Sequence, residues 1–437
     1  MGKRILIISY YFAPQNAIGA VRPTKLAKYL ARMGHEVTVL CGPGMNGRRD
    51  PTLERDLREL KDVRVIREWN PLRAYKAKKT ARSAASGPSA QARQGSPRSS
   101  GLKRRVADAA YLYLWWRADR SFCHRAIAEL GSLKGTYDMV FSTYAPFSVH
   151  EIAREVKRRG LAKRWIADFR DEVNLSFQWQ AGRKARYLRM LRREADVLCA
   201  VSDGFLEMMG FEDVGRVLSN GYDREDLPPA GGKARTDGAL RVVYCGTLLE
   251  GRRNVAERDV TPMLRALAAL IAQGRLDAKE LRLVYAGGEG ALFRRYAASC
   301  GLEACVEDHG LVSREASIAL QRGADILLMA SWHMASQRGI LTGKLFEYMM
   351  MEKPIVCCMS GDLPGSGVKK VLAQTGLGLC VEQAAGPDGE EELRRYLATL
   401  VDRWRQEKPL LSSKQADEVE AFAYPALAAV LAGWMEG

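Results

Sequence analysis

The sequence predicts an α/β protein that folds as two domains. The chain has 437 residues, which is too long for one ordinary core, so two domains of about 200 residues each are expected. Residues 4–42 read as an apolar strand, a helix-forming segment and a second strand. The same order recurs at residues 324–359. Two such βαβ patterns at opposite ends of the chain predict a parallel sheet in each domain.

Composition suits a soluble globular protein. Apolar residues make up 47% of the chain and charged residues 27%. No uninterrupted run of about 18 apolar residues appears, and the N-terminus runs straight into a strand, so we expect a cytoplasmic protein without a signal peptide. The nine cysteines lie mostly in apolar segments and lack the spacing of zinc ligands, so we expect them to be reduced.

The segment 324–359 contains the residue types of a nucleotide site. Its helix is expected at 342–352, beginning beside the carboxyl end of the strand at 324–330, where open α/β sheets bind ligands. Gly343 allows close backbone approach, Lys344 offers a charge for phosphate, and Glu347 can accept hydrogen bonds from a ribose diol. A solvated surface ion pair between Lys344 and Glu347, three residues apart, is the alternative.

The string G-K-L-F-E-Y at 343–348, followed by M-x-x-x-K-P-I-V, resembles the donor-binding signature of the family-4 retaining glycosyltransferases, in the subset related to polysaccharide biosynthesis. The resemblance implies the GT-B architecture, two Rossmann-like domains facing across a cleft. It places an acceptor domain at 1–222, a donor domain at 223–418, and a helix at 419–437 that crosses back to the first domain. Glu347 matches the second of two family glutamates, while Gly339 stands where the first is expected.

The resemblance also identifies further donor-binding residues. In the family, an arginine and a lysine after the first strand of the second domain neutralise the donor diphosphate. Thr247 occupies the arginine position after Gly246, and Arg252 occupies the lysine position, with Arg253 as a second cation. Without the resemblance, solvent exposure is the expectation for two adjacent arginines. The turn at Gly310 and Leu311 is implied to hold the nucleobase.

The first domain supplies the remaining candidates. Its opening loop, with Gly19 and Arg22, resembles the family loop that faces the cleft, although a turn glycine and a surface arginine are the alternative. The sequence D-F-R-D ends a predicted strand at 164–171, and it makes Asp168 and Asp171, flanking Arg170, the acid/base candidates. A structural ion network is the alternative.

The cleft histidine of many family members is replaced in this chain. Thr143 stands at its position. His150, seven residues further on, lies in a predicted helix and is expected to be a packed or surface residue rather than a catalyst.

The excess positive charge has a local origin. The formal net charge is +16, and residues 69–107 contain ten Lys or Arg and no acid. A segment at about 72–105 is rich in Ser, Ala, Gly and Pro, so we expect a disordered insertion there. Clustered aromatics follow at 111–116, and the combination over 73–116 suits peripheral contact with an anionic membrane. Core aromatics with solvated cations are the alternative, and no nucleic-acid motif accompanies the charge.

The sequence therefore predicts a metal-independent glycosyltransferase that uses a nucleotide diphosphate sugar as donor substrate and needs no cofactor. We expect a glycan acceptor, one linked to a lipid, at the inner face of a membrane. Two alternatives stay open: a sugar-nucleotide epimerase of the GT-B superfamily, and a binding protein without catalytic activity.

Overall fold

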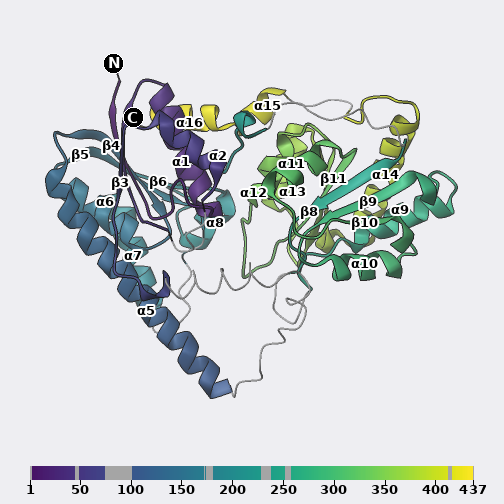
Figure 1. Cartoon of the computed structure of the whole chain (residues 1–437), viewed down its shortest axis with the longest axis horizontal. Helices are drawn as coiled ribbons and strands as arrows, with labels where there is room; N and C mark the ends of the chain where they lie inside the picture. Colours follow the sequence, from purple (N-terminus) through teal and green to yellow (C-terminus); the bar gives the residue numbers. More distant parts are fainter. Residues whose placement is uncertain are drawn as a thin grey trace. The chain divides into compact units, whose positions relative to one another are not determined.

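The computed structural model describes residues 2–44, 49–73, 101–171, 173, 181–227, 238–250, 257–411 and 416–436. These residues form two compact units (Figure 1). The N-terminal unit comprises Met1–Val201, Leu206–Leu218 and Leu427–Gly437, and the C-terminal unit comprises Ser202–Phe205 and Ser219–Ala426.

The N-terminal unit is built on a parallel sheet. Its strands are β1 (Arg4–Ser9), β2 (Glu36–Cys41), β3 (Asp62–Val65), β4 (Tyr137–Tyr144), β5 (Ala162–Phe169), β6 (Val197–Ala200) and β7 (Arg216–Val217). Its helices are α1 (Ile18–Arg32), α2 (Pro51–Asp56), η1 (Leu57–Glu59), α5 (Gly101–Glu129), η2 (Leu130–Ser132), α6 (Ser148–Arg158) and α7 (Ala181–Glu194), with parts of α8 (Asp203–Met209) and α16 (Tyr424–Gly433). The strand order is β3-β2-β1-β4-β5-β6-β7.

That strand order has a reversal point between β1 and β4. From β1 the chain moves outward through β2 and β3, then returns to place β4 on the other side of β1. Loops at the carboxyl ends of β1 and β4 diverge there, which is where open α/β sheets leave a crevice. The central strands are buried on both sides, as expected for apolar runs such as Ile5 to Ile8, whereas the edge strands β3 and β7 are more exposed.

The C-terminal unit repeats this design with a second parallel sheet. Its strands are β8 (Leu240–Cys245), β9 (Leu281–Ala286), β10 (Val306–Asp308), β11 (Ile326–Trp332), β12 (Ile355–Ser360) and β13 (Gly378–Glu382). Its helices are η4 (Arg224–Asp226), α9 (Thr261–Ala272), η5 (Ala278–Glu280), α10 (Gly290–Ser299), η6 (Glu303–Cys305), α11 (Arg314–Arg322), α12 (Gly343–Met349), α13 (Gly367–Thr375), η7 (Gln383–Ala385), α14 (Gly386–Arg405) and α15 (Ala416–Glu420).

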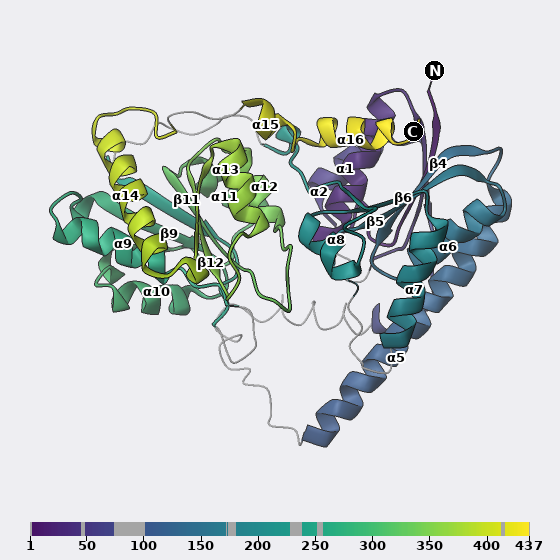
Figure 2. The ribbon, with the colours of Figure 1, turned by 180° about the vertical axis from the view of Figure 1, so that it is seen from behind.

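Two hydrophobic clusters cover the two faces of this second sheet. Leu240, Val242 and Tyr244 of β8 pack with α9, α10 and α14, whereas Val243 and Cys245 pack with α11, α12 and α13. The alternation follows from the two-residue period of a strand. Figure 2 shows the two groups of helices on either side of the strands. The order β10-β9-β8-β11-β12-β13 reverses between β8 and β11.

Most of the expected elements differ from the observed ones by only one or two residues. The strand expected at 324–330 is β11, and the helix expected at 342–352 is α12, which ends three residues earlier. The predicted disordered insertion needs a correction. Residues 101–105, which we assigned to it, form the first turns of α5, because Lys and Arg are good helix formers and lead directly into the helical segment. Residues 74–100 of the insertion lie outside the described residues.

Candidate functional site

The reversal point of the C-terminal sheet brings Lys344 against Gly246. Gly246 follows the carboxyl end of β8, and Lys344 lies in the first turn of α12, which follows β11. A Cβ atom on Gly246 would lie 2.0 Å from Nζ of Lys344, and Gly246 has a φ of +136°. The glycine is therefore required for both space and backbone conformation at this point.

Lys344 is a partly buried cation without an anionic partner. Its Nζ lies 4.5 Å from the centroid of the Tyr244 ring. Within the described residues, Nζ makes no hydrogen bond and no ion pair. Burial and, to a smaller extent, the positive charge of Arg258 together lower the pKa of Lys344 to about 8, against smaller opposing effects of Cys245 and Glu347. An anion placed here would restore the charged state.

Arg258 is a second cation at this site, and sequence analysis missed it. Its Nη1 donates to the carbonyl oxygen of Thr247 at 3.0 Å, and its guanidinium lies 5.2 Å from the Trp332 ring centroid. An isolated antiparallel β-bridge pairs Arg258 with Leu249 and so brings Arg258 close to the loop that follows β8. Nε of Arg258 is buried and unpartnered in the described part of the chain. No motif marks Arg258, because the contact depends on that bridge. Arg252 and Arg253 lie outside the described residues.

Glu347 is held by a buried glutamine rather than by Lys344. Nε2 of Gln321, from α11, donates to Oε1 of Glu347 at 2.6 Å and to Oγ of Ser317 at 3.0 Å. Gln321 is fully buried. The alternative of a surface ion pair between Lys344 and Glu347 is wrong, because no such pair forms among the described side chains. Among the described residues, Oε2 of Glu347 has no hydrogen-bond partner, so it is available to a ligand.

The predicted nucleobase turn lies beside the same strand ends. Gly310 has a φ of +62°, and its carbonyl oxygen accepts a hydrogen bond from the backbone N–H of Gly287 at 2.9 Å. Gly287 directly follows β9, so the turn is joined to the neighbour of β8. Leu311 is 74% exposed. An exposed apolar side chain at this place provides a surface on which a base can stack.

Gly339 could not be a glutamate in this conformation. Its φ is +74°, and a Cβ would lie 2.6 Å from Oγ of Ser202 and 2.7 Å from the backbone of Gly204. Oγ of Ser202 also donates to the carbonyl oxygen of Gly339 at 2.6 Å. The segment 202–205 belongs to the C-terminal unit. The local packing therefore requires a glycine here, where the resemblance to the family would place a glutamate.

In the N-terminal unit, Asp168 is buried in an ion pair. Nη2 of Arg22 lies 2.7 Å from Oδ1 of Asp168, and Oγ1 of Thr143 donates to Oδ2 at 2.7 Å. Asp168 has no exposed surface, and Arg22 is also buried. The interpretation of Arg22 as a surface residue is therefore wrong. The structural ion network that the sequence left open fits Asp168 better than an acid/base role, because a substrate cannot reach the carboxylate.

Arg170 joins the loops at the reversal point of the first sheet. Its Nε donates to the carbonyl oxygen of Tyr144 at 2.6 Å, and its Nη1 donates to the carbonyl oxygen of Gly19. A Cβ on Gly19 would lie 2.0 Å from Nη1, so the glycine makes room for the guanidinium. Asp171 lies 3.6 Å from Arg170, and its side chain is 67% exposed. Asp171 is thus the accessible carboxylate of the predicted pair.

His150 is a core residue. Its Nδ1 lies 2.8 Å from Oγ of Ser142, while Nε2 is buried without a partner among the described residues. Aromatic rings, including Phe169 at 4.9 Å between centroids, surround the imidazole. Burial lowers its pKa to about 3, so it is neutral at pH 7. The expectation that His150 is packed rather than catalytic agrees with this environment.

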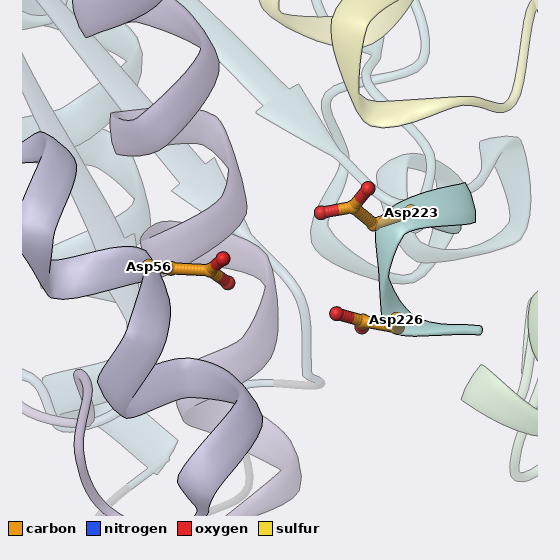
Figure 3. Close-up of side chains that lie close together, drawn as sticks. All are labelled: Asp56, Asp223 and Asp226. Carbon is orange, nitrogen blue, oxygen red and sulfur yellow. The ribbon is translucent and has the colours of Figure 1, made fainter. Parts of the chain in front are cut away.

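Figure 3 shows the carboxylates of Asp56, Asp223 and Asp226. Each has a partner in its own unit. Asp56 lies 2.7 Å from Nζ of Lys25, within the N-terminal unit. In the C-terminal unit, Asp223 accepts a hydrogen bond from the backbone N–H of Glu225, and Asp226 lies 3.2 Å from Arg314. We assign no metal to these carboxylates.

No helix within the described residues combines the length and the apolar character needed to cross a bilayer.

Comparison with known proteins gives a partial family match and a whole-chain structural likeness. Residues 240–398 match the family Glycosyl transferases group 1. No protein with a curated description matches the sequence. A glycosyltransferase from Rickettsia africae ESF-5 is 14% identical, with a TM-score of 0.55 over 100% of this chain and 98% of that chain. The lipopolysaccharide outer core galactosyltransferase WaaB is 13% identical, with a TM-score of 0.55 over 98% of each chain.

A third similar structure is the N-terminal domain of trehalose-6-phosphate phosphatase from Candida albicans. It is 13% identical, with a TM-score of 0.61 over 100% of this chain and 97% of that chain. At these identities, the likeness shows the fold. It confirms the prediction of two Rossmann-like domains of the GT-B type. The family match over residues 240–398 lies within the C-terminal unit and includes Gly246, Lys344 and Glu347.

Proposed function

We propose that the protein is a retaining glycosyltransferase that moves a sugar from a nucleotide diphosphate sugar to a lipid-linked glycan in cell-surface polysaccharide assembly. The observation that carries the proposal is the ammonium of Lys344, enclosed at the reversal point of the second sheet without an anionic partner among the described residues. A partly buried cation without a counter-charge is costly, and a diphosphate compensates it.

Neutralisation of the leaving group is the main catalytic contribution of this site. When the glycosidic bond to the donor phosphate breaks, negative charge grows on the nucleoside diphosphate. Lys344 lies in the space that Gly246 leaves open, and Arg258 is held by the carbonyl oxygen of Thr247. Preorganised cations stabilise such charge without further rearrangement. We propose that they perform this role without a metal, with Arg252 and Arg253 as additional cations.

Glu347 and the turn at Gly310 would hold the nucleoside. Oε2 of Glu347 is available for ribose or sugar hydroxyls, because Gln321 occupies Oε1. Leu311 would contact the base. In the N-terminal unit, Asp171 would orient the acceptor hydroxyl, while Arg22, Gly19 and Arg170 would shape the loop around it. Asp168 would act only through its ion pair with Arg22.

The exposed aromatic side chains of α5 support a peripheral contact at the inner face of a membrane. Tyr111, Tyr113 and Trp116 are 37%, 56% and 38% exposed. The alternative that these three belong to the core is therefore wrong. Aromatic rings beside a basic segment at 73–105 suit the interface of an anionic leaflet, and a lipid-linked acceptor would be presented there.

The decisive experiment is protection against thermal unfolding by UDP-, GDP-, ADP- and TDP-sugars. A ligand at about a hundredfold excess over its Kd should add about 2.7 kcal/mol to the free energy of unfolding. We expect one nucleotide class to protect the wild-type protein and to lose its effect on Lys344→Met and Glu347→Ala. Lys370→Met, at an exposed lysine of α13, is the matched control. Full protection of both site variants would refute the donor site.

The two alternatives predict different products from the same bound donor. An epimerase would convert the protecting nucleotide sugar into its epimer with no acceptor present, which NMR of the sugar detects. A binding protein would show protection by the donor without turnover, even with membrane-extracted glycan acceptors. Retention is tested by the anomeric configuration of the transferred sugar.

A further inference from the structure

A cavity of about 100 Å³ lies in the N-terminal unit, apart from the candidate donor site. It is lined by Trp116, Asp119, Arg120, Phe147, Glu151, Arg183 and Tyr187. These residues come from α5, the start of α6, and α7, which lie together beside the first sheet (Figures 1 and 2). This volume is smaller than that of an enclosed drug-sized site, so the cavity has room for only part of a ligand.

The polar lining combines buried, paired charges with groups that have no protein partner. Asp119 is buried and accepts a hydrogen bond from Oγ of Ser148 and one from Nη2 of Arg120. Nη1 of Arg120 donates to Oε2 of Glu151. Nε of Arg120 is buried and has no partner in the described parts of the chain. Burial raises the pKa of Asp119 despite the neighbouring guanidinium.

Three further polar groups at the cavity have no hydrogen-bond partner in the described part of the protein. For the described residues, no hydrogen bond is found for Oε1 of Glu151, for Nε1 of Trp116 or for the guanidinium of Arg183. The cavity therefore presents one carboxylate acceptor and several N–H donors to a ligand. Two carboxylates and two guanidinium groups balance in charge, so a phosphate gains little net attraction here.

Aromatic rings form the remaining walls. The rings of Phe147 and Tyr187 meet edge to face at 4.8 Å between centroids, and the hydroxyl of Tyr187 donates to the carbonyl oxygen of Phe147 at 3.0 Å. This hydrogen bond orients the Tyr187 ring. Trp116 is only partly covered. Such walls would suit the apolar face of a ring whose polar groups point outward to the carboxylate and guanidinium groups.

The cavity is close in the fold to the proposed acceptor carboxylate. Phe147 and Glu151 lie at the start of α6, which follows the carboxyl end of β4. Tyr144, at that end, pairs in register with Phe169 at the end of β5. Asp171 follows Phe169 by two residues. Phe147 and Glu151 of the cavity, and Asp171, thus follow strands that end at the same edge of the first sheet.

We propose that this cavity binds a sugar residue of the acceptor glycan, a proposal that rests on the glycosyltransferase function above. A hydrocarbon chain would bury the Glu151 and Arg183 charges without giving them partners, which is unfavourable. A sugar supplies both hydroxyl donors for Oε1 of Glu151 and acceptors for Arg183, Nε of Arg120 and the indole N–H of Trp116. Trp116 and Glu151 are the residues on which selection among acceptors depends.

The test is saturation-transfer NMR on the full chain with methyl glycosides of hexoses, 6-deoxyhexoses and N-acetylhexosamines, together with short oligosaccharides. Octyl phosphate probes for a lipid instead. We expect at least one glycoside to bind the wild-type protein, with affinity at least tenfold weaker in Trp116→Ala and Glu151→Gln. Arg183→Ala should also weaken binding. Arg186→Ala, an exposed arginine one turn further along α7, should not.

Two outcomes would overturn the assignment: no glycoside binds, or binding is unchanged in Trp116→Ala and Glu151→Gln. Preferential binding of octyl phosphate would assign the cavity to a lipid. Protection by nucleotide sugars, measured on the same variants, should remain at the wild-type level. If no nucleotide sugar protects the wild-type protein against unfolding, the donor site is refuted whatever the cavity binds. The results therefore distinguish a failure of the donor site from a failure of the cavity assignment.

Discussion

The ammonium nitrogen of Lys344 lies 4.5 Å from the centroid of the Tyr244 ring. The ring is fixed by its hydroxyl, which donates to the carbonyl oxygen of Thr247 at 2.9 Å. A cation over an aromatic face gains about 0.5 to 2 kcal/mol, which offsets only part of the cost of burying the charge. The site is thus prepared for an anion, and this relationship determines the first two predictions.

Gly246→Ala should abolish nucleotide binding because its new Cβ displaces Lys344, an effect that backbone strain alone does not produce. The new Cβ would lie 2.0 Å from Nζ of Lys344 at a φ of +136°, so the lysine must move. Gly274→Ala is the matched control, because Gly274 has a φ of +68° with no atom within 4 Å of the added Cβ. Both variants should lose about 1 to 3 kcal/mol in the free energy of unfolding, measured with urea. Only Gly246→Ala should lose protection by the nucleotide, and equal protection in both would contradict the site.

Nucleotide binding should weaken above pH 8. The pKa of Lys344 is lowered from 10.5 to about 8, so the ammonium is mostly charged below pH 8 and mostly neutral above it. Affinity for the protecting nucleotide should be steady from pH 6.5 to 7.5 and then fall by up to about tenfold per pH unit. Isothermal titration calorimetry measures this dependence. An unchanged affinity at pH 9 would exclude Lys344 as the phosphate ligand.

The same shift makes an opposite prediction for the stability of the free protein. Between pH 8 and 10.5 the unfolded chain binds more protons at Lys344 than the folded one. The unfavourable contribution of Lys344 is therefore complete below pH 8 and disappears as the pH approaches 10.5. Lys344→Met should lack this contribution and be at least as stable as the wild-type protein at pH 7, by chemical denaturation.

Gln321→Glu should make donor affinity depend on pH. The substitution places a second carboxyl group where Nε2 now lies 2.6 Å from Oε1 of Glu347. A pair that shares one proton preserves the contact, whereas two ionised carboxylates repel each other and displace Glu347. Nucleotide affinity should therefore fall by at least tenfold from pH 6 to pH 8, while the wild-type protein changes little. Ser317→Ala removes only the other hydrogen bond of Nε2 and should leave the profile unchanged.

His150 should make the protein sensitive to mild acid. Its folded pKa is lowered to about 3, so below pH 6.5 the unfolded chain binds a proton that the folded protein excludes. Its stabilising contribution is complete above pH 6.5 and is lost progressively towards pH 3. Between pH 7.5 and 5 the loss should be about 2 kcal/mol at most. A wild-type loss equal to that of His150→Gln, by urea denaturation, would contradict this assignment.

Local sequence patterns predicted the strands and the position of the donor helix, because a buried strand and the helix that follows it are encoded within about 30 residues. The apolar runs now seen as β8, β11 and β12 were recognisable for that reason. Arg258 was not, since its role depends on a bridge to Leu249 that no local pattern marks. Residues 74–100 and the arginines at 252 and 253 remain sequence predictions.

Local sequence patterns also could not distinguish the roles of Asp168 and Asp171, although the two residues are only three positions apart. Both carboxylates end the same predicted strand and looked alike in sequence. The parallel pairing of β4 with β5 directs Asp168 onto Thr143 and Arg22, where it is buried, while Asp171 lies beyond the last strand residue and is exposed. Pairing between strands separated by many residues decides which acid is accessible.

By itself, the sequence determined the class of the fold, the place of Lys344 at the start of a helix after a buried strand, and the resemblance to a sugar-transferring family. Only the tertiary structure decided that Tyr244, Gly246 and Arg258 surround that lysine, and that Gln321 rather than Lys344 holds Glu347. The physical reason is the strand order. The neighbours β8 and β11 are more than 80 residues apart in the chain, and contacts across such a reversal follow from packing rather than from any local pattern.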